Sequence, residues 1–234
     1  MQGISYSVLE GLRLVATLDL RLWEIVGLSL GVSLSAVAAA TLFGLPLGAA
    51  LAVGRFPGRR AAIVTLNALM GLPPVVVGLM VYLLLSRAGP LGNLGMLFTP
   101  GAMVIAQTIL ILPIIAALSR QAVEDAWCEY EEQLRSLGME GMPAALTLVW
   151  DIRFTLVTAV LAGLGRACAE VGAVMIVGGN IDGVTRVMTT TIALETSKGD
   201  LPLALGLGIV LIGIVFALNA AADVVKESAQ RRVG

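Results

Sequence analysis

The sequence predicts an all-α integral membrane protein with about five transmembrane helices. Of its 234 residues, 58% are hydrophobic and only 13% are charged, and the mean hydropathy is +0.94. Soluble domains carry about 25% charged residues. The apolar residues are gathered in long runs, and a helix needs about 20 of them to cross the hydrocarbon core of a bilayer. Because a membrane segment must satisfy its own backbone hydrogen bonds, five helices are the simplest interpretation of these runs.

Residues 1–24 form an amphipathic segment at the amino terminus. Charged side chains interrupt the apolar core that a signal peptide would need. The apolar side chains recur at helical spacing, at Val8, Leu12, Val15, Leu18 and Leu22. We expect a helix that lies in the membrane interface; the alternative is a mobile tail.

Five apolar stretches follow and make one transmembrane domain, residues 25–234. They are residues 25–53, 61–86, 101–119, 154–181 and 201–222. The first stretch contains two glycine pairs, Gly27 with Gly31 and Gly44 with Gly48. A spacing of four between small residues lets two helices approach closely.

Prolines interrupt two of these stretches. Pro73 and Pro74 are expected to bend or break the second stretch, because neither amide can donate and each ring clashes with the preceding turn. Pro113 lies inside the third stretch. Such prolines are either simple kinks or parts of a gate.

A charged segment, residues 121–153, separates the third and fourth stretches. Its apolar residues repeat at steps of four and three along one helical face, at Val123, Trp127, Tyr130, Leu134 and Leu137. Gly138 suits a corner after this helix, because glycine takes positive φ at no steric cost. Pro143 suits the first turn of a second short helix. The predicted helix-turn-helix offers a charged surface to a soluble partner; the alternative is a loop that simply stays in water.

Within this segment, Glu132 and Gly138 resemble the E-A-A-x-x-x-G loop of ABC-importer permeases. Gln133 and Leu134 stand where that motif has alanines, and of its later I-x-L-P only an apolar start survives, at Leu148. In that family the loop is a coupling helix that docks on a separate ATP-hydrolysing subunit. The resemblance implies a coupling set in this chain: Glu131, Glu132, Arg135, Ser136, Leu137 and Gly138.

Arg166 and Glu170 lie inside the fourth stretch. An arginine near the centre of a span costs about 2.5–3.5 kcal/mol on insertion scales, so it is usually paired or faces water. A spacing of four places the two side chains on one helical face, where they can pair. Either the pair only neutralises itself, or both side chains line a translocation path in which the arginine attracts an anion. The other candidates for this path are Gly172, Pro73 and Pro74.

Residues 163–199 closely resemble the permeases of tungstate ABC importers. The shared runs are GRAxAEVGAVMIVGGNI and TRVMTTxIALETSKGD, and residues 169–173 also resemble the GExGA run of molybdate permeases. The resemblance extends loosely over residues 25–222. It implies the type I ABC-importer fold, a homodimer of permease chains, two cytoplasmic ATPase subunits and an external oxyanion-binding protein. ATP and magnesium would be bound by the ATPase subunits, and this chain would hold no cofactor.

The same resemblance implies that residues 180–200 meet the binding protein or cap the path. Turn-forming residues end the fourth stretch here, and a helical spacing resumes from Val187. The candidate residues are Asn180, Arg186, Thr189 and Thr190. The hydroxyls of residues 189–191 could contact an oxyanion, but a polar surface helix is the preferred interpretation.

The distribution of lysine and arginine predicts the orientation in the membrane. If the charged segment is inside, nine of these residues are inside: Arg55, Arg59, Arg60, Arg120, Arg135, Arg153, Lys226, Arg231 and Arg232. Five are outside: Arg13, Arg21, Arg87, Arg186 and Lys198. The chain is then a multi-pass protein of the inner or plasma membrane, with its amino terminus outside and its carboxyl terminus in the cytoplasm.

The remaining patterns exclude other classes of function. No G-x-x-x-x-G-K-[ST] loop occurs, so the chain lacks a P-loop, and we predict a transport subunit rather than an enzyme. The absence of histidine and the presence of only two cysteines give no case for a metal site, and a net charge of -1 gives none for nucleic acid.

We therefore predict the permease subunit of an ABC importer that moves an oxyanion into the cytoplasm, with tungstate assigned by resemblance. The alternative is an ion-driven secondary anion carrier that uses Glu170 as its titrating group. Such carriers usually show an internal repeat and more spans.

Overall fold

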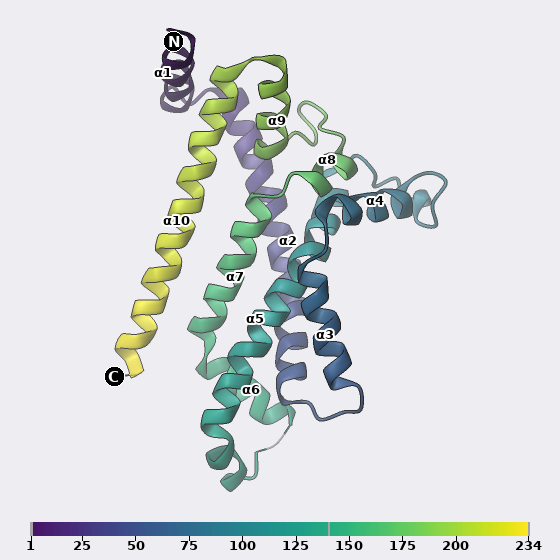
Figure 1. Cartoon of the computed structure of the whole chain (residues 1–234), viewed down its shortest axis with the longest axis vertical. Coiled ribbons are helices and arrows are strands. Elements are labelled where there is room, and N and C mark those ends of the chain that lie inside the picture. The colour runs from purple at the N-terminus through teal and green to yellow at the C-terminus, as the bar shows by residue number, and fades with distance from the viewer. Residues whose placement is uncertain (1, 140, 234) are drawn as a thin grey trace. The chain divides into compact units, whose positions relative to one another are not determined.

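The computed structural model describes residues 2–139 and 141–233, and in these residues every regular element is a helix. The elements are α1 (Gln2–Ala16), α2 (Leu20–Val53), α3 (Arg59–Met70), α4 (Pro74–Leu85), the 3₁₀ turn η1 (Gly92–Leu94), α5 (Pro100–Ser136), α6 (Met142–Asp151), α7 (Arg153–Cys168), α8 (Gly172–Gly178), α9 (Met188–Lys198) and α10 (Leu201–Val233) (Figure 1). The prediction of an all-α membrane protein is confirmed.

Within the described residues, three helices are each long and apolar enough to cross a membrane. They are α2, α5 and the first 25 residues of α10. The number rises to five if each of two bent helix pairs counts as one span. One bent pair is α3 with α4; the other is α6 with α7, which meet at 77°. The predicted count of five is reached only with both bent pairs, and the second of these pairs does not coincide with the predicted fourth stretch, residues 154–181.

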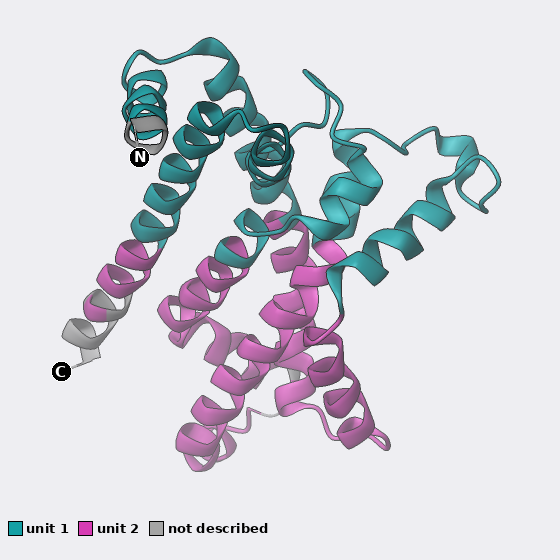
Figure 2. Ribbon diagram, turned by 45° about the horizontal axis from the view of Figure 1, so that its top comes forward, with its two compact units in different colours: residues 1–36, 73–107, 165–218 teal, residues 37–72, 108–164, 219–234 magenta. Residues whose placement is uncertain are grey.

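The chain folds into two compact units that interleave in sequence (Figure 2). Unit 1 comprises residues 1–36, 73–107 and 165–218, and unit 2 comprises residues 37–72, 108–164 and 219–234. Each unit has its own apolar core. The boundary between residues 1–24 and the rest of the chain stays a prediction.

The core of unit 1 joins three helices. It is formed by Leu22, Ile25 and Val26 of α2, Met188 of α9, and Leu203 and Leu207 of α10. Helix α1 packs on the same unit through Gly11, where an added Cβ would lie 2.9 Å from the carbonyl oxygen of Pro202. Glycine at this position lets the α1 backbone lie directly against α10.

The core of unit 2 joins α2 to α5 and α6. It contains Ala49, Ala52, Val123, Ala126, Leu134, Ala144 and Leu148. The second glycine pair lies in the carboxyl-terminal half of α2 and faces α5. A Cβ at Gly44 would lie 3.2 Å from Ile115, and a Cβ at Gly48 would lie 2.5 Å from the carbonyl oxygen of Ala116. The predicted close approach is confirmed for this pair. It is wrong for Gly27 and Gly31, which have no neighbour within 4 Å of an added Cβ.

The amino-terminal segment is not one helix. The prediction of a helix is confirmed for α1, but the chain leaves it after Ala16 and turns at Leu18, which has φ +54°. Leu18 is consequently exposed, whereas Leu22 belongs to α2 and is fully buried. The prediction of a single apolar face from Val8 to Leu22 was therefore wrong. Asp19 starts a new helix, because its side chain accepts a hydrogen bond from the Leu22 amide. The interfacial position of α1 stays a prediction.

Two of the other predicted stretches also differ from the structure. The expected break before Pro74 is confirmed, since α3 ends at Met70 and α4 begins at Pro74. Residues 154–181 are not one helix: α7 ends at Cys168 and α8 starts at Gly172. The third stretch is longer than predicted, because α5 continues through Pro113 and on to Ser136.

Candidate functional site

The predicted corner after α5 is confirmed at Gly138. The Gly138 amide donates to the carbonyl of Arg135 at 2.9 Å, and the Met139 amide donates to the carbonyl of Leu134 at 2.9 Å. These two bonds are the Schellman pattern that closes a helix with a left-handed residue. Gly138 has φ +71°, a conformation that other L-residues rarely adopt. The corner is therefore fixed by backbone bonds and by the identity of this glycine.

The coupling candidates on the last turns of α5 are mostly exposed. Glu131 forms ion pairs with Arg135 at 2.7 Å and with Arg55 at 3.3 Å, so it ties the end of α5 to the segment after α2. Glu132 is exposed and Ser136 donates to the carbonyl of Gln133 at 2.7 Å. Within the predicted apolar stripe, Leu134 is buried but Leu137 is 74% exposed, so the stripe was wrong at its last member.

Helix α6 adds residues that the sequence prediction missed. Its start is Gly141, whose φ of 65° and ψ of -132° suit glycine alone. Ala144 and Leu148 face the core of unit 2. On the opposite face Leu146 is 63% exposed and Trp150 is 72% exposed. Their spacing of four indicates an exposed apolar face on the helix. The sequence prediction did not separate the apolar residues of α6 into a buried and an exposed face.

A small cavity lies beside this corner. Its volume is about 180 Å³, and its lining includes Arg55, Arg135, Trp127 and Gly141. Arg153, at the start of α7, lies over the rings of Trp150 and Phe154 at 5.0 and 4.8 Å. A cation–π contact at an exposed site is worth about 0.5–1 kcal/mol. The corner thus presents an exposed aromatic side chain beside several charged ones.

Arg166 and Glu170 form the predicted ion pair in unit 1, with 2.6 Å between Arg166 Nη1 and Glu170 Oε2. The pairing is confirmed, but the two residues do not lie on one helix as predicted. Glu170 lies beyond the end of α7, in the break before α8. Its other oxygen, Oε1, accepts a hydrogen bond from the Ala173 amide at 3.1 Å, and its carbonyl accepts one from Thr189 at 2.7 Å.

The two members of this pair have different environments. The Glu170 side chain is 3% exposed and the Arg166 side chain is 36% exposed. Glu170 therefore connects the end of α7 to α8 and α9 from inside the unit. Arg166 keeps guanidinium donors on the accessible side, where an anion can approach.

The other path candidates lie near the start of α8. Pro73 precedes α4 and Pro74 is its first residue. An added Cβ at Gly172 would lie 2.9 Å from Val75 Cγ2 and 3.8 Å from Glu170 Oε1. The structure thus brings Gly172 close to both the first turn of α4 and the ion pair.

The segment after α8 is a compact turn followed by α9. Thr185 donates to the carbonyl of Gly178 and accepts from the Ile181 amide, while Arg186 pairs with Asp182 at 2.8 Å. Asn180 has φ +51°.

The preferred interpretation of residues 189–191 as a polar surface helix was wrong. Thr189 is 7% exposed, and Thr190 and Thr191 are fully buried. The last two donate to the carbonyl of Val187, at 3.1 and 2.7 Å, so all three hydroxyls satisfy backbone acceptors. A threonine can bury its methyl group when its hydroxyl finds such a partner. None of these hydroxyls is directed toward an external ligand.

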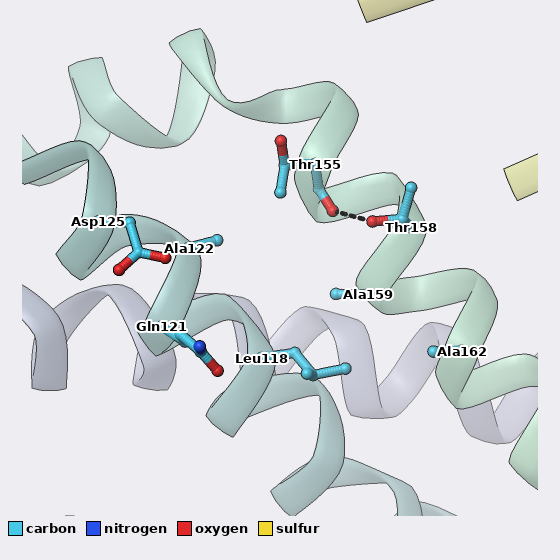
Figure 3. A pocket seen from close by; sticks show the side chains of 8 residues that line it. All are labelled: Leu118, Gln121, Ala122, Asp125, Thr155, Thr158, Ala159 and Ala162. Carbon is cyan, nitrogen blue, oxygen red and sulfur yellow. Dashed lines mark hydrogen bonds between the residues drawn. The ribbon is translucent and has the colours of Figure 1, made fainter. Parts of the chain in front are cut away.

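A larger groove lies between α5 and α7 in unit 2 (Figure 3). Its volume is about 350 Å³, and none of the predicted site residues lines it. Alanines from both helices form much of its wall, and its polar residues are Gln121, Asp125, Thr155 and Thr158. In the described parts of the chain, no three side chains of histidine, cysteine, aspartate or glutamate gather in a geometry that could hold a metal ion.

Comparison with known proteins agrees with this architecture. The chain is 39% identical to the tungstate uptake system permease protein TupB of Peptoclostridium acidaminophilum over 220 residues, which cover 94% of this chain and 96% of that protein. It is 41% identical to a probable anion ABC transporter permease protein of Haloferax volcanii, over 84% of this chain and 87% of that protein. No family model matches the sequence.

More distant similarity reaches sulfate permeases. The chain is 32% identical to the sulfate transport system permease protein CysW of Synechocystis, over 83% of this chain and 71% of that protein. This protein therefore belongs to the permease subunits of ABC transporters, in the family that contains these tungstate, anion and sulfate permeases.

Proposed function

We propose that this chain is the membrane-spanning subunit of an ABC importer that brings an oxyanion, tungstate, into the cytoplasm. The observation that carries the proposal is the similarity to a tungstate uptake permease over 94% of the chain. ATP hydrolysis takes place on a separate subunit, with ATP and magnesium bound there and no cofactor in this chain. Two permease chains, two ATPase subunits and an external binding protein make the complete importer.

The coupling surface consists of the end of α5, the Gly138 corner and the outer face of α6. An exposed acidic residue, Glu132, lies before the corner, and the apolar side chains of Leu137, Leu146 and Trp150 are exposed on and after it. Exposed aromatic and aliphatic side chains beside charged ones are typical of a binding centre with a polar rim. The ATPase subunit is the partner of this surface.

The translocation path passes Arg166. A tetrahedral dianion can accept hydrogen bonds from the guanidinium donors that Glu170 does not use. Glu170 holds this arginine in place from inside unit 1, and Gly172 lets the first turn of α4 pack closely beside the pair. Asn180 and Arg186 belong to the segment that meets the binding protein.

The proposed orientation places the amino terminus outside and the coupling surface in the cytoplasm, where ATP is available. It rests on the excess of lysine and arginine on that side.

The contacts of Glu170 argue against the alternative function, an ion-driven anion carrier. Both of its carboxylate oxygens already accept hydrogen bonds, and the side chain is almost fully buried, so a coupled ion has no open approach to it.

The experiment is a mild-detergent purification of the tagged chain from its native membrane, followed by identification of the copurifying proteins and an ATPase assay. An ATPase subunit should copurify with the wild-type chain. The substitution Trp150→Ala together with Leu146→Ala should weaken that association at least tenfold. Phe216→Ala, which removes an exposed aromatic side chain from α10, is the matched control and should leave it unchanged.

Copurification of the intact chain without any ATPase would overturn the proposal. If the complex is obtained, it should be reconstituted in liposomes with the binding protein and supplied with tungstate, molybdate or sulfate. Uptake of another anion in preference to tungstate would contradict the substrate assignment alone.

A further inference from the structure

The segment that joins α2 to α3 is held to α5 by a cluster of three charged residues that the sequence prediction did not single out. Glu124 accepts a hydrogen bond from Arg59 on one carboxylate oxygen and from Arg120 on the other. Arg59 is the first residue of α3, and Arg120 and Glu124 lie one turn apart on α5. All three residues belong to unit 2.

Arg59 also closes the end of α2. Its Nε donates to the carbonyl of Leu51 at 2.8 Å, and its Nη2 donates to the carbonyl of Ala52 at 3.1 Å. These are carbonyls of the last turn of α2, which have no partner inside the helix. A cation at a helix carboxyl terminus also interacts favourably with the helix dipole. One guanidinium therefore joins the end of α2, the start of α3 and α5.

The same two helices are already packed closely before they reach this cluster. Because Gly48 has no side chain, the α2 backbone lies against Ala116 and Ser119 of α5. Ala52 of α2 packs in one core with Val123 of α5. The α2–α5 contact thus runs from Gly44 to the charged cluster. Between the cluster and the Gly138 corner, α5 continues without a break.

We propose that Glu124 is a positioning residue for energy coupling: it fixes the α2–α3 corner, residues 53–59, to α5, so that a displacement of the coupling surface moves α3 with it. This inference rests on the proposed function, because it presupposes an ATPase partner at the Gly138 corner. The side chains of Arg59, Arg120 and Glu124 are 32%, 15% and 31% exposed, so the cluster is only partly open to solvent. Such pairs are screened less than fully exposed ones.

The first test measures uptake per ATP in liposomes that contain the whole importer and tungstate. Glu124→Gln keeps the shape of the side chain but removes its charge. The complex should assemble and hydrolyse ATP at a rate within twofold of the wild type, while tungstate uptake per ATP falls at least fivefold. Glu124→Asp should recover part of the loss. Asp125→Asn, at the next and exposed position of α5, is the matched control and should behave as the wild type.

The second test measures the corner directly and does not depend on transport. Spin labels are placed on the exposed Cys128 and on Phe56→Cys, in a Cys168→Ser background, within the purified complex. In the wild type the distance between the labels should stay the same with and without ATP. In the Glu124→Gln variant the distribution should broaden.

The outcomes separate the two proposals. If wild-type liposomes show no ATP-driven tungstate uptake, the proposed function fails whatever happens at Glu124. If the wild type transports and Glu124→Gln lowers only the amount or thermal stability of the complex, with normal uptake per ATP, the residue is structural and the inference is overturned. A label distance in the wild type that changes with ATP also overturns it.

Discussion

Arg166 and Glu170 show how differently two members of one ion pair can be used. Glu170 makes two hydrogen bonds through its carboxylate and one through its carbonyl, to three separate elements. Arg166 donates one of its bonds to Glu170 and remains 36% exposed. Removal of Arg166 would leave the almost fully buried Glu170 carboxylate without its charged partner, and an unpaired buried charge is destabilising. Glu170 therefore holds three elements together, whereas Arg166 is the more exposed member, which we propose is available to a substrate.

At the residue scale, we predict that Arg166→Ala impairs tungstate uptake more than Arg166→Lys. Lysine keeps a positive charge but loses the planar fork that binds two oxygens at once. We expect uptake to fall at least tenfold for alanine and by less for lysine, measured in membranes with equal amounts of the chain. Equal loss in both variants at normal protein levels would point to folding instead of transport.

A second prediction at this scale concerns Gly138. Valine at φ +71° is strained, at a cost of at least about 1–2 kcal/mol, so Gly138→Val should distort the corner. ATP hydrolysis should continue while uptake is lost, and the chain should still insert. Gly138→Asn is the control, because asparagine tolerates the left-handed conformation. Normal transport by the valine variant would contradict the role of Gly138 as the coupling corner.

At the element scale, α4 and α8 of unit 1 pack with their backbones almost in contact. An added Cβ at Gly78 would lie 2.8 Å from the Cα of Ala173, and both positions are buried. Backbone atoms on the far side cannot move aside as a flexible side chain does. The packing of α4 on α8 therefore depends on this glycine in a way that composition alone does not reveal.

We predict that Gly78→Val destabilises the protein by about 1–3 kcal/mol, the usual cost of overpacking. The measurement is the thermal unfolding midpoint of the detergent-solubilised chain. Gly213→Val on α10, where nothing lies within 4 Å of an added Cβ, is the matched control and should shift the midpoint little. A Gly78→Val variant as stable as the control would show that α4 can move away from α8.

The elements also show how far prediction from sequence can reach. The long apolar helices and the Gly138 corner were predictable, because hydropathy and a glycine after an amphipathic run are local signals. The break between Cys168 and Gly172 was not, since the residues across it are mostly apolar and form no turn motif. Nor were the burial of Thr190 and the pairing of Arg59 with Glu124, which depend on partners far away in the sequence.

At the scale of the whole molecule, the orientation is open to test. In a Cys128→Ser background, a cysteine at the exposed position Leu137 should react with a membrane-impermeant maleimide only in inverted vesicles. A cysteine at the exposed position Leu91 should react only in intact cells or right-side-out vesicles. The reverse pattern would contradict the orientation derived from lysine and arginine, and with it the access of ATPase subunits to the corner.

The continuity of α5 limits how this protein can move in its membrane. A helix of 37 residues is about 55 Å long, whereas the hydrocarbon core is about 30 Å thick. The part beyond Ser119 carries seven charged residues: Arg120, Glu124, Asp125, Glu129, Glu131, Glu132 and Arg135. Each would cost about 2.5–3.5 kcal/mol near the bilayer centre. Sliding of α5 along its own axis is therefore strongly opposed, because it would draw these charges into the hydrocarbon core.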